Sequence, residues 1–134
     1  MKVFLDTNVL ATAIGTRGLC SDVLREVLLR HELLTSVQVE EELERALRVK
    51  CRAPADAVAA AMGLLRQAAR RAPATPHRAV PLRDRADVAV VSAALNGEAE
   101  VLVTGDREIQ ALGKVGDLEI LSPRSFWDRV RRPS

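Results

Sequence analysis

Short apolar runs that alternate with longer amphipathic segments organise this chain. Residues Val3–Leu5 are consecutively apolar and lead directly into Asp6, and Val101–Val103 lead through Thr104 toward Asp106. Apolar runs of this length, bounded by polar residues, are typical of strands buried on both faces of a parallel sheet. The pattern therefore predicts strands at 3–5 and 101–104, each followed closely by an aspartate.

The remainder of the chain continues this alternation of strand and helix patterns. Apolar residues recur at helical spacing between the short runs, and Ser, Pro and Gly residues mark helix ends. This order predicts a three-layer α/β/α fold with a central, mainly parallel sheet of four to five strands, in a single domain spanning 1–134. The expected elements are a strand at 3–5, a loop or short helix at 8–18, a helix at 21–30, a strand at 33–36, helices at 37–50 and 54–71, an irregular connection at 73–81, a helix at 85–96, a strand at 101–104, a helix at 106–113, a strand at 118–121 and a helix at 123–131.

Composition restricts how the protein can contact other molecules. Hydrophobic residues make up 48% of the chain, yet its aromatic residues are Phe4, Phe126 and Trp127 alone. Aromatic platforms that stack RNA bases are therefore not expected. Because Phe126 and Trp127 are neighbours in the last helix, that helix either packs on its own sheet or contributes to a homodimer.

Charge and cysteine content point to an intracellular protein that can bind phosphate. The net charge is only +2, but arginine is clustered at 45–52, 66–71, 83–85 and 129–132. Arginine suits phosphate oxygens, although solvated helix faces explain any single cluster equally well. Cys20 and Cys51 form no Cys-x-x-Cys motif, and no apolar run approaches the ~20 residues of a membrane span, so we expect a cytoplasmic protein without a membrane segment.

Four glutamates crowd the helix predicted at 37–50. If Val39 and Leu43 mark its buried face, a rotation of about 100° per residue puts Glu41 on the solvent side. Glu40 and Glu42 then flank the buried face. Glu42 can face the ends of the predicted strands, although an ordinary surface position remains the simpler explanation for it.

Three further aspartates lie where helices are predicted to begin. Asp84 and Asp87 open the helix at 85–96, where an N-cap followed by an acid three residues later imitates a capping box. Asp106 likewise fits as the N-cap of the helix at 106–113. Capping alone therefore explains these residues as well as a functional site does.

Taken together, the four acids suggest one shared site instead of separate structural roles. Asp6, Asp87 and Asp106 each lie at a strand end or a helix start, and Glu42 can face them. Ionised carboxylates that share a cleft repel one another unless a cation neutralises them. Oxygen ligands select Mg²⁺ or Mn²⁺, which suggests hydrolysis of phosphodiester bonds.

The motifs around these acids resemble those of the PIN-domain nucleases. The resemblance rests on Phe-Leu-Asp-Thr-Asn at 4–8, Glu42-Leu43 after Ser36, Asp87 at its helix start and Val-Thr-Gly-Asp at 103–106. The segment 120–126, Ile-Leu-Ser-Pro-Arg-Ser-Phe, is similar to the VapC-like toxin components of type II toxin-antitoxin systems.

This resemblance implies a metal-dependent endoribonuclease with an RNA substrate, a cognate antitoxin and a homodimeric state. It makes Asp6, Glu42, Asp87 and Asp106 the metal-binding and catalytic acids, with Asn8, Ser36 and Thr104 as polar support. Members often carry another Asp two positions after the last acid; this chain has Glu108 there, which is a fourth supporting candidate. Residues 52–83 match no motif and are candidates for setting substrate choice.

Other functions fit the sequence less well. A haloacid-dehalogenase-type phosphotransferase needs a second Asp where Asn8 stands, and the scattered glycines form no nucleotide-binding motif. A PIN-like module that binds RNA or protein without cleavage, and a housekeeping RNA-processing nuclease, remain the alternatives. The presence of all four acids favours cleavage over binding alone.

Overall fold

The sheet at the centre of the protein has six strands. The computed structural model describes residues 1–77 and 80–132. The strand order is β3-β2-β1-β4-β6-β5, with β5 antiparallel to β6 and the other four pairings parallel. The strands are β1 (Lys2–Leu5), β2 (Glu32–Thr35), β3 (Ala69–Arg71), β4 (Val101–Val103), β5 (Lys114–Val115) and β6 (Leu118–Leu121).

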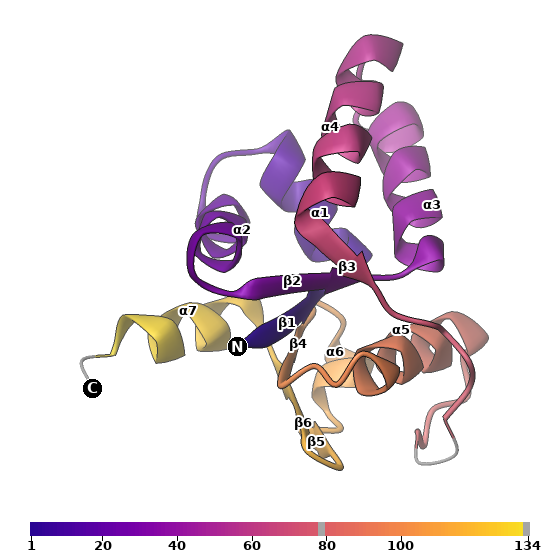
Figure 1. Cartoon of the computed structure of the whole chain (residues 1–134), viewed down its shortest axis with the longest axis vertical. Coiled ribbons are helices and arrows are strands. Elements are labelled where there is room, and N and C mark those ends of the chain that lie inside the picture. The colour runs from indigo at the N-terminus through magenta and orange to yellow at the C-terminus, as the bar shows by residue number, and fades with distance from the viewer. Residues whose placement is uncertain (78–79, 133–134) are drawn as a thin grey trace.

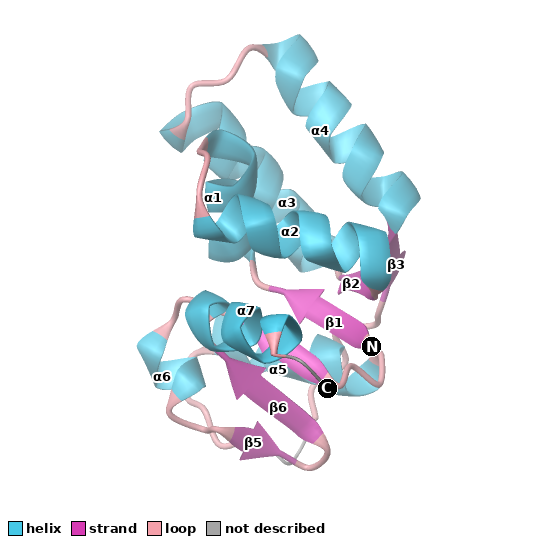
Figure 2. Cartoon of the chain, turned by 90° about the vertical axis from the view of Figure 1, so that its left-hand side faces the viewer, coloured by secondary structure: helices cyan, strands magenta, loops and turns pink. Residues whose placement is uncertain are grey.

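Helices cover both faces of this sheet. In Figure 1, α1 to α4 lie above β1 and β2, whereas α5 and α6 lie below them, and Figure 2 shows the same separation from the side. The predicted three-layer α/β/α architecture is thereby confirmed, with six strands where four to five were expected. The helices are α1 (Thr7–Gly15), α2 (Leu19–Arg30), α3 (Val37–Arg45), the π-helical turn η1 (Ala46–Lys50), α4 (Ala55–Ala68), α5 (Arg85–Asn96), α6 (Arg107–Gln110) and α7 (Pro123–Arg131).

The central strands are buried on both faces, as their uninterrupted apolar sequences predict. Val3–Leu5, Leu33, Leu34 and Val101–Val103 are each at most 2% exposed. Helices on both sides exclude water from these residues, so their alkyl groups supply much of the hydrophobic stabilisation. No helix in the described part of the chain is long and apolar enough to cross a bilayer.

The direction of the chain crossovers reverses between β1 and β4. The connection from β1 to β2 runs through α1 and α2 on one face, whereas the connection into β4 runs through α5 on the other (Figure 1). Leu5 pairs with Val103 in register, and the Asp6 amide donates to the Val103 carbonyl at 3.0 Å. Ligands of open α/β sheets bind outside the carboxyl ends of strands at such a reversal. Asp6 therefore lies at the position where a site is expected.

Several element boundaries differ from the sequence-based prediction. The predicted helix at 54–71 ends at Ala68, and its last three residues form β3 at the sheet edge. Residues 7–15 form a complete helix, the helix expected at 37–50 ends in a π-helical turn, and the helix expected at 106–113 spans one turn. The short strand β5 was not predicted because two residues carry no period-2 pattern. Residues 78 and 79 of the connection expected at 73–81 lie outside the described residues.

The two aromatic residues of the last helix pack within the chain. Phe126 is fully buried, and its ring meets the His31 ring edge-on at 6.1 Å between centroids. Trp127 is partly buried, and the Arg131 guanidinium carbon lies 5.2 Å from its ring centroid. Helix α7 thus contributes Phe126 to the hydrophobic core of its own chain. The homodimer remains a prediction.

A buried carboxylate links the polar strand β3 to α3 and α4. The Glu40 side chain is 4% exposed and accepts hydrogen bonds from Arg66 Nε at 3.0 Å and Arg71 Nη2 at 2.9 Å. These bonds, chiefly that from Arg71, hold the pKa of Glu40 below its usual value of 4.5. The ion pairs tie α3 to α4 and β3, and residues 69–71 also pair in parallel with β2 at the sheet edge.

We expect Arg71→Met to lower the melting temperature more than Arg129→Met does. Arg71 serves a buried Glu40, whereas Arg129 pairs at 2.8 Å with a Glu119 that is 42% exposed and can be solvated by water instead. Because the folded pKa of Glu40 is depressed, the difference should be present above pH 4.5 and disappear as the pH falls through that folded pKa. Thermal denaturation at pH 7 and at pH 3 measures it, and equal effects of the two variants at pH 7 would contradict the assigned role.

Candidate active site

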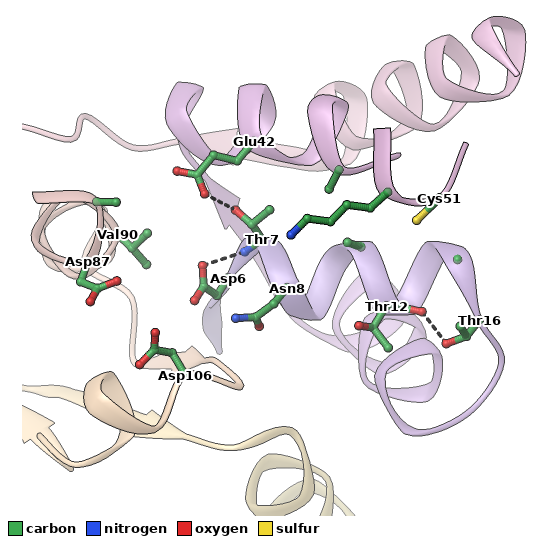
Figure 3. A pocket seen from close by; sticks show the side chains of 15 residues that line it. Asp6, Thr7, Asn8, Thr12, Thr16, Glu42, Cys51, Asp87, Val90 and Asp106 are labelled. Atoms are coloured by element: carbon green, nitrogen blue, oxygen red, sulfur yellow. Dashed lines mark hydrogen bonds between the residues drawn. The ribbon is translucent and has the colours of Figure 1, made fainter. Parts of the chain in front are cut away.

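Four acidic side chains line one cavity beside the carboxyl ends of β1 and β4. The cavity has a volume of about 540 Å³. Asp6 follows β1, Asp106 follows β4, Asp87 lies in the first turn of α5, and Glu42 projects from α3. Figure 3 shows these carboxylates arranged around the same space. The topology therefore brings together residues that are up to 100 positions apart in the sequence.

Asp6 is the most deeply buried of the four. It is 7% exposed, and its Oδ2 accepts a hydrogen bond from the Thr104 hydroxyl at 2.7 Å while its Oδ1 accepts one from the Thr7 amide at 2.7 Å. Burial raises the pKa of this carboxyl, and the nearby Glu42 and Asp106 raise it further, against the two hydrogen bonds. Its ionised form is thus oriented, but no cation of the described protein compensates its charge.

Asp106 both caps a helix and faces the cavity. Its Oδ1 accepts hydrogen bonds from the amides of Glu108 at 2.8 Å and Ile109 at 3.1 Å, which is the N-cap predicted for this residue. Its Oδ2 has no hydrogen-bond partner among the described residues, and the side chain lines the cavity. Capping and a functional role are therefore compatible here, because each uses a different oxygen.

Asp84 and Asp87 have separate roles at the start of α5. Asp84 is the N-cap, since its Oδ1 accepts from the amides of Ala86 at 2.8 Å and Asp87 at 3.1 Å. The Asp87 carboxylate has no hydrogen bond or ion pair within the described residues. Burial, followed by repulsion from Asp106 and other neighbouring acids, raises its pKa to about 6. Asp87 thus lies in the first turn of α5 but does not cap the helix.

Glu42 is held in place by two donors that the sequence analysis did not single out. The Gln38 side-chain amide donates to Glu42 Oε1 at 2.7 Å. The Thr7 hydroxyl donates to Glu42 Oε2 at 3.2 Å, as Figure 3 shows. Gln38 is four residues before Glu42, so the i, i+4 spacing of a helix is a signal that could have identified it. Thr7 lies inside the Phe-Leu-Asp-Thr-Asn motif, but nothing in its residue type predicts a contact with α3.

The four residues predicted as polar support occupy different positions. Thr104 contacts Asp6 directly, and Asn8 Oδ1 accepts from the Gly105 amide at 3.2 Å. A Cβ at position 105 would lie 3.4 Å from that oxygen, an ordinary van der Waals distance, so this contact does not itself require glycine. Ser36 does not line the cavity; its hydroxyl caps α3 by accepting from the Val39 amide at 3.2 Å. The exposed Glu108 also lies outside the cavity lining, although its charge contributes to the raised pKa of Asp87.

The donor set suits a hard divalent cation that keeps part of its water shell. Within residues 1–77 and 80–132, no three His, Cys, Asp or Glu side chains converge closely enough to form a complete protein cage for a metal. Mg²⁺ usually keeps several waters and binds through one or two carboxylates. The four carboxylates and their mutual repulsion therefore fit such an ion in chemistry, whereas the one thiol of the lining, Cys51, lies on the side of the cavity opposite Asp87 and Asp106 (Figure 3).

The sequence of this chain matches a known protein family. The family model for the PIN domain matches residues 2–108, a range that contains all four acids. The chain belongs to the PIN-domain family. This membership confirms the resemblance inferred from the motifs. PIN domains are nucleases as a family, which supports a nuclease kind of activity for this member.

One solved structure shows the same fold over nearly the whole chain. It is the crystal structure of VapBC2 from Rickettsia felis bound to a DNA fragment from their promoter. The similarity has a TM-score of 0.63 at 14% sequence identity and covers 91% of this PIN-domain chain and 98% of the other. No curated protein matches the chain.

In metal-free protein, we expect Asp87→Asn to raise the melting temperature by about 2 to 5 °C at pH 8. The folded pKa of Asp87 lies above its unfolded value of 3.8, so the stability that this residue contributes is complete below pH 3.8 and is lost as the pH rises through about 6. The advantage of the variant should therefore shrink between pH 8 and pH 5. Melting curves in a chelator test this, with the exposed Asp128→Asn on α7 as the control. A pH-independent difference would show that repulsion at Asp87 is not its cause.

Proposed function

We propose that this PIN-domain protein is a Mg²⁺- or Mn²⁺-dependent endoribonuclease that acts as the toxin of a toxin-antitoxin pair. The observation that carries the proposal is the set of four carboxylates around one cavity, without an ion pair to any of them in the described residues and with the pKa of Asp87 raised to about 6. A protein with no use for a cation gains nothing from this electrostatic cost. The cytoplasm, where RNA and divalent cations are available, is the proposed location.

Asp6, Glu42, Asp87 and Asp106 would hold the cation, some of them through the water molecules that Mg²⁺ or Mn²⁺ keeps, because no three acids in the described residues converge closely enough to bind it directly. When bound, Mg²⁺ or Mn²⁺ supplies Lewis acidity toward phosphodiester oxygens and lowers the pKa of a water for attack at phosphorus. The chain's own contribution is orientation. Thr104 and Thr7 fix Asp6, and Gln38 and Thr7 fix Glu42, so the carboxylates do not have to reorganise when the substrate arrives.

Asp87 also couples cation binding to proton release. With a pKa of about 6, its carboxyl carries a proton for part of the time near neutral pH. A cation requires the ionised form, so binding displaces this proton into the solvent, and affinity should increase with pH through this range. A PIN-like module that binds RNA or protein without cutting it would have no need of this arrangement.

The toxin role, the antitoxin partner and the homodimer rest on family resemblance together with the VapBC2-like fold. A housekeeping RNA-processing nuclease shares the same site chemistry and is the second candidate. Expression of the chain alone in a bacterial host should arrest growth, and co-expression of the neighbouring gene should restore it. Normal growth with soluble, folded protein would favour the housekeeping role.

Asp106→Asn separates capping from cation binding. Asparagine caps a helix as well as aspartate does, so a purely structural Asp106 predicts unchanged stability and unchanged activity. Our proposal predicts an equal or higher melting temperature without metal, because one repelling charge is removed. It also predicts a smaller increase in melting temperature on addition of millimolar Mn²⁺, since a ligand that binds only the folded state stabilises it by mass action.

Cleavage of a mixed RNA pool by the same variant should fall by more than about 100-fold, which exceeds the usual effect of residues that only support a metal ligand. Asp128→Asn serves again as the matched control, with wild-type behaviour expected. An Asp106→Asn variant with wild-type metal response and wild-type cleavage would overturn the proposed site.

A further inference from the structure

The active-site cavity has a second end whose chemistry differs from that of the acids. Figure 3 shows Thr12, Thr16 and Cys51 on the side opposite Asp87 and Asp106, and Gly15 and Lys50 line the same cavity. Helix α1 runs along the cavity, and its nine residues span about 13 to 14 Å. The cavity is therefore longer than a site for one cation and one phosphate group requires.

The π-helical turn η1 turns Lys50 toward the cavity. Glu42, Ala46 and Lys50 are spaced four residues apart and all line the cavity. In a regular α-helix each step of four residues rotates the side chain onward by about 40°, which would turn Lys50 roughly 80° away from Glu42. The Cys51 amide instead donates to the Ala46 carbonyl at 3.0 Å, five residues back. This wider turn returns Lys50 to the face of Glu42, and such π-bulges occur frequently at functional sites.

Lys50 is a cation without a partner in the protein. Several basic side chains elsewhere are occupied by a glutamate, such as Arg66 and Arg71 by Glu40, and Lys2 by Glu98. Lys50 has no hydrogen bond or ion pair among the described residues, even though four carboxylates line the same cavity. Its ammonium group is thus not used to neutralise the acids, and it remains available to an anion that enters from solvent.

We propose that Lys50 binds a backbone phosphate of the substrate strand next to the phosphodiester that is cleaved. This proposal rests on the proposed function, because it assigns the substrate side of the same cavity. The cut phosphodiester lies at the acidic end, and a single-stranded RNA carries its next phosphates along α1 toward Lys50. A lysine there attracts a phosphate as a point charge without reading the base, so it contributes affinity but no sequence preference.

A second cavity continues the same path beyond α1. It has a volume of about 650 Å³, shares Gly15 and Thr16 with the first, and is also lined by Arg17, Arg25 and one acid, Asp22. The exposed Arg17 and Arg25 have no hydrogen bond or ion pair in the described part of the chain. Positive charge thus increases along the path that leads away from the carboxylates, in the direction in which the proposal places the strand.

The experiment compares RNA cleavage by wild-type protein, Lys50→Gln, Lys50→Arg and Arg48→Gln in Mn²⁺ at several KCl concentrations. Arg48 is the matched control because it lies in the same π-helical turn but lines a different groove, with Glu44 and Arg66. We expect Lys50→Gln to raise KM about tenfold without changing kcat, as loss of uniform substrate binding does. The slope of log kcat/KM against log salt should become shallower by about 0.7, which corresponds to one phosphate contact with a single strand. Lys50→Arg should retain most of the affinity, and Arg48→Gln should behave as wild type.

Each of the other possible outcomes would overturn the proposed role of Lys50. If wild-type protein cleaves RNA and Lys50→Gln matches Arg48→Gln in KM and salt slope, the proposal is wrong while the proposed function stands. If Lys50→Gln instead lowers the metal-free melting temperature with unchanged KM, Lys50 serves to offset carboxylate repulsion, and the proposal is equally wrong. If folded wild-type protein cleaves no RNA, the proposed function and this inference fail together.

Discussion

One buried hydroxyl holds the two halves of the acidic cavity together. Thr104 Oγ1 donates to Asp6 Oδ2 at 2.7 Å and accepts from the Asp106 amide at 3.0 Å. It therefore orients the acid that follows β1 and fixes the start of the loop that carries the acid after β4. This contact is possible because β1 and β4 pair in parallel and in register, which places their carboxyl ends side by side. Asp87 and Glu42 complete the acidic cavity only because Asp6 and Asp106 already lie side by side at this edge of the sheet.

The remaining architecture opposes the repulsion that this edge creates. Asp6 and Asp87 both have raised pKa values, so the site destabilises the folded protein near neutral pH unless something neutralises it. The buried strands of the sheet and the Glu40 ion pairs with α4 and β3 supply stability away from the cavity. These parts of the protein keep the carboxylates close together in the absence of a cation. Functional sites commonly cost stability in this way, and the rest of the protein compensates for it.

The sequence carries enough information to find the acids but not their partners. Asp6 and Asp106 follow from apolar runs that end in carboxylates, and helical periodicity separates Glu42 from the exposed Glu41. The burial of Glu40 depends on arginines of α4 and β3, a strand whose Ala-Arg-Arg sequence has no strand pattern because its stability comes from edge pairing. Lys50 reaches the cavity only through a π-helical turn, and residue spacing in a regular helix cannot predict such a turn.

The decisive measurement is cleavage of single-stranded RNA by the purified chain with and without divalent cations, because it asks whether the four carboxylates work through a bound cation. We expect no cleavage in a chelator, cleavage after excess Mg²⁺ or Mn²⁺ is added, and none after an excess of chelator is added back, with the protein folded throughout. Cleavage that persists undiminished in the chelator would show that the four carboxylates work without a cation. If the folded protein leaves RNA intact at millimolar Mg²⁺ and Mn²⁺, it is not a metal-dependent ribonuclease.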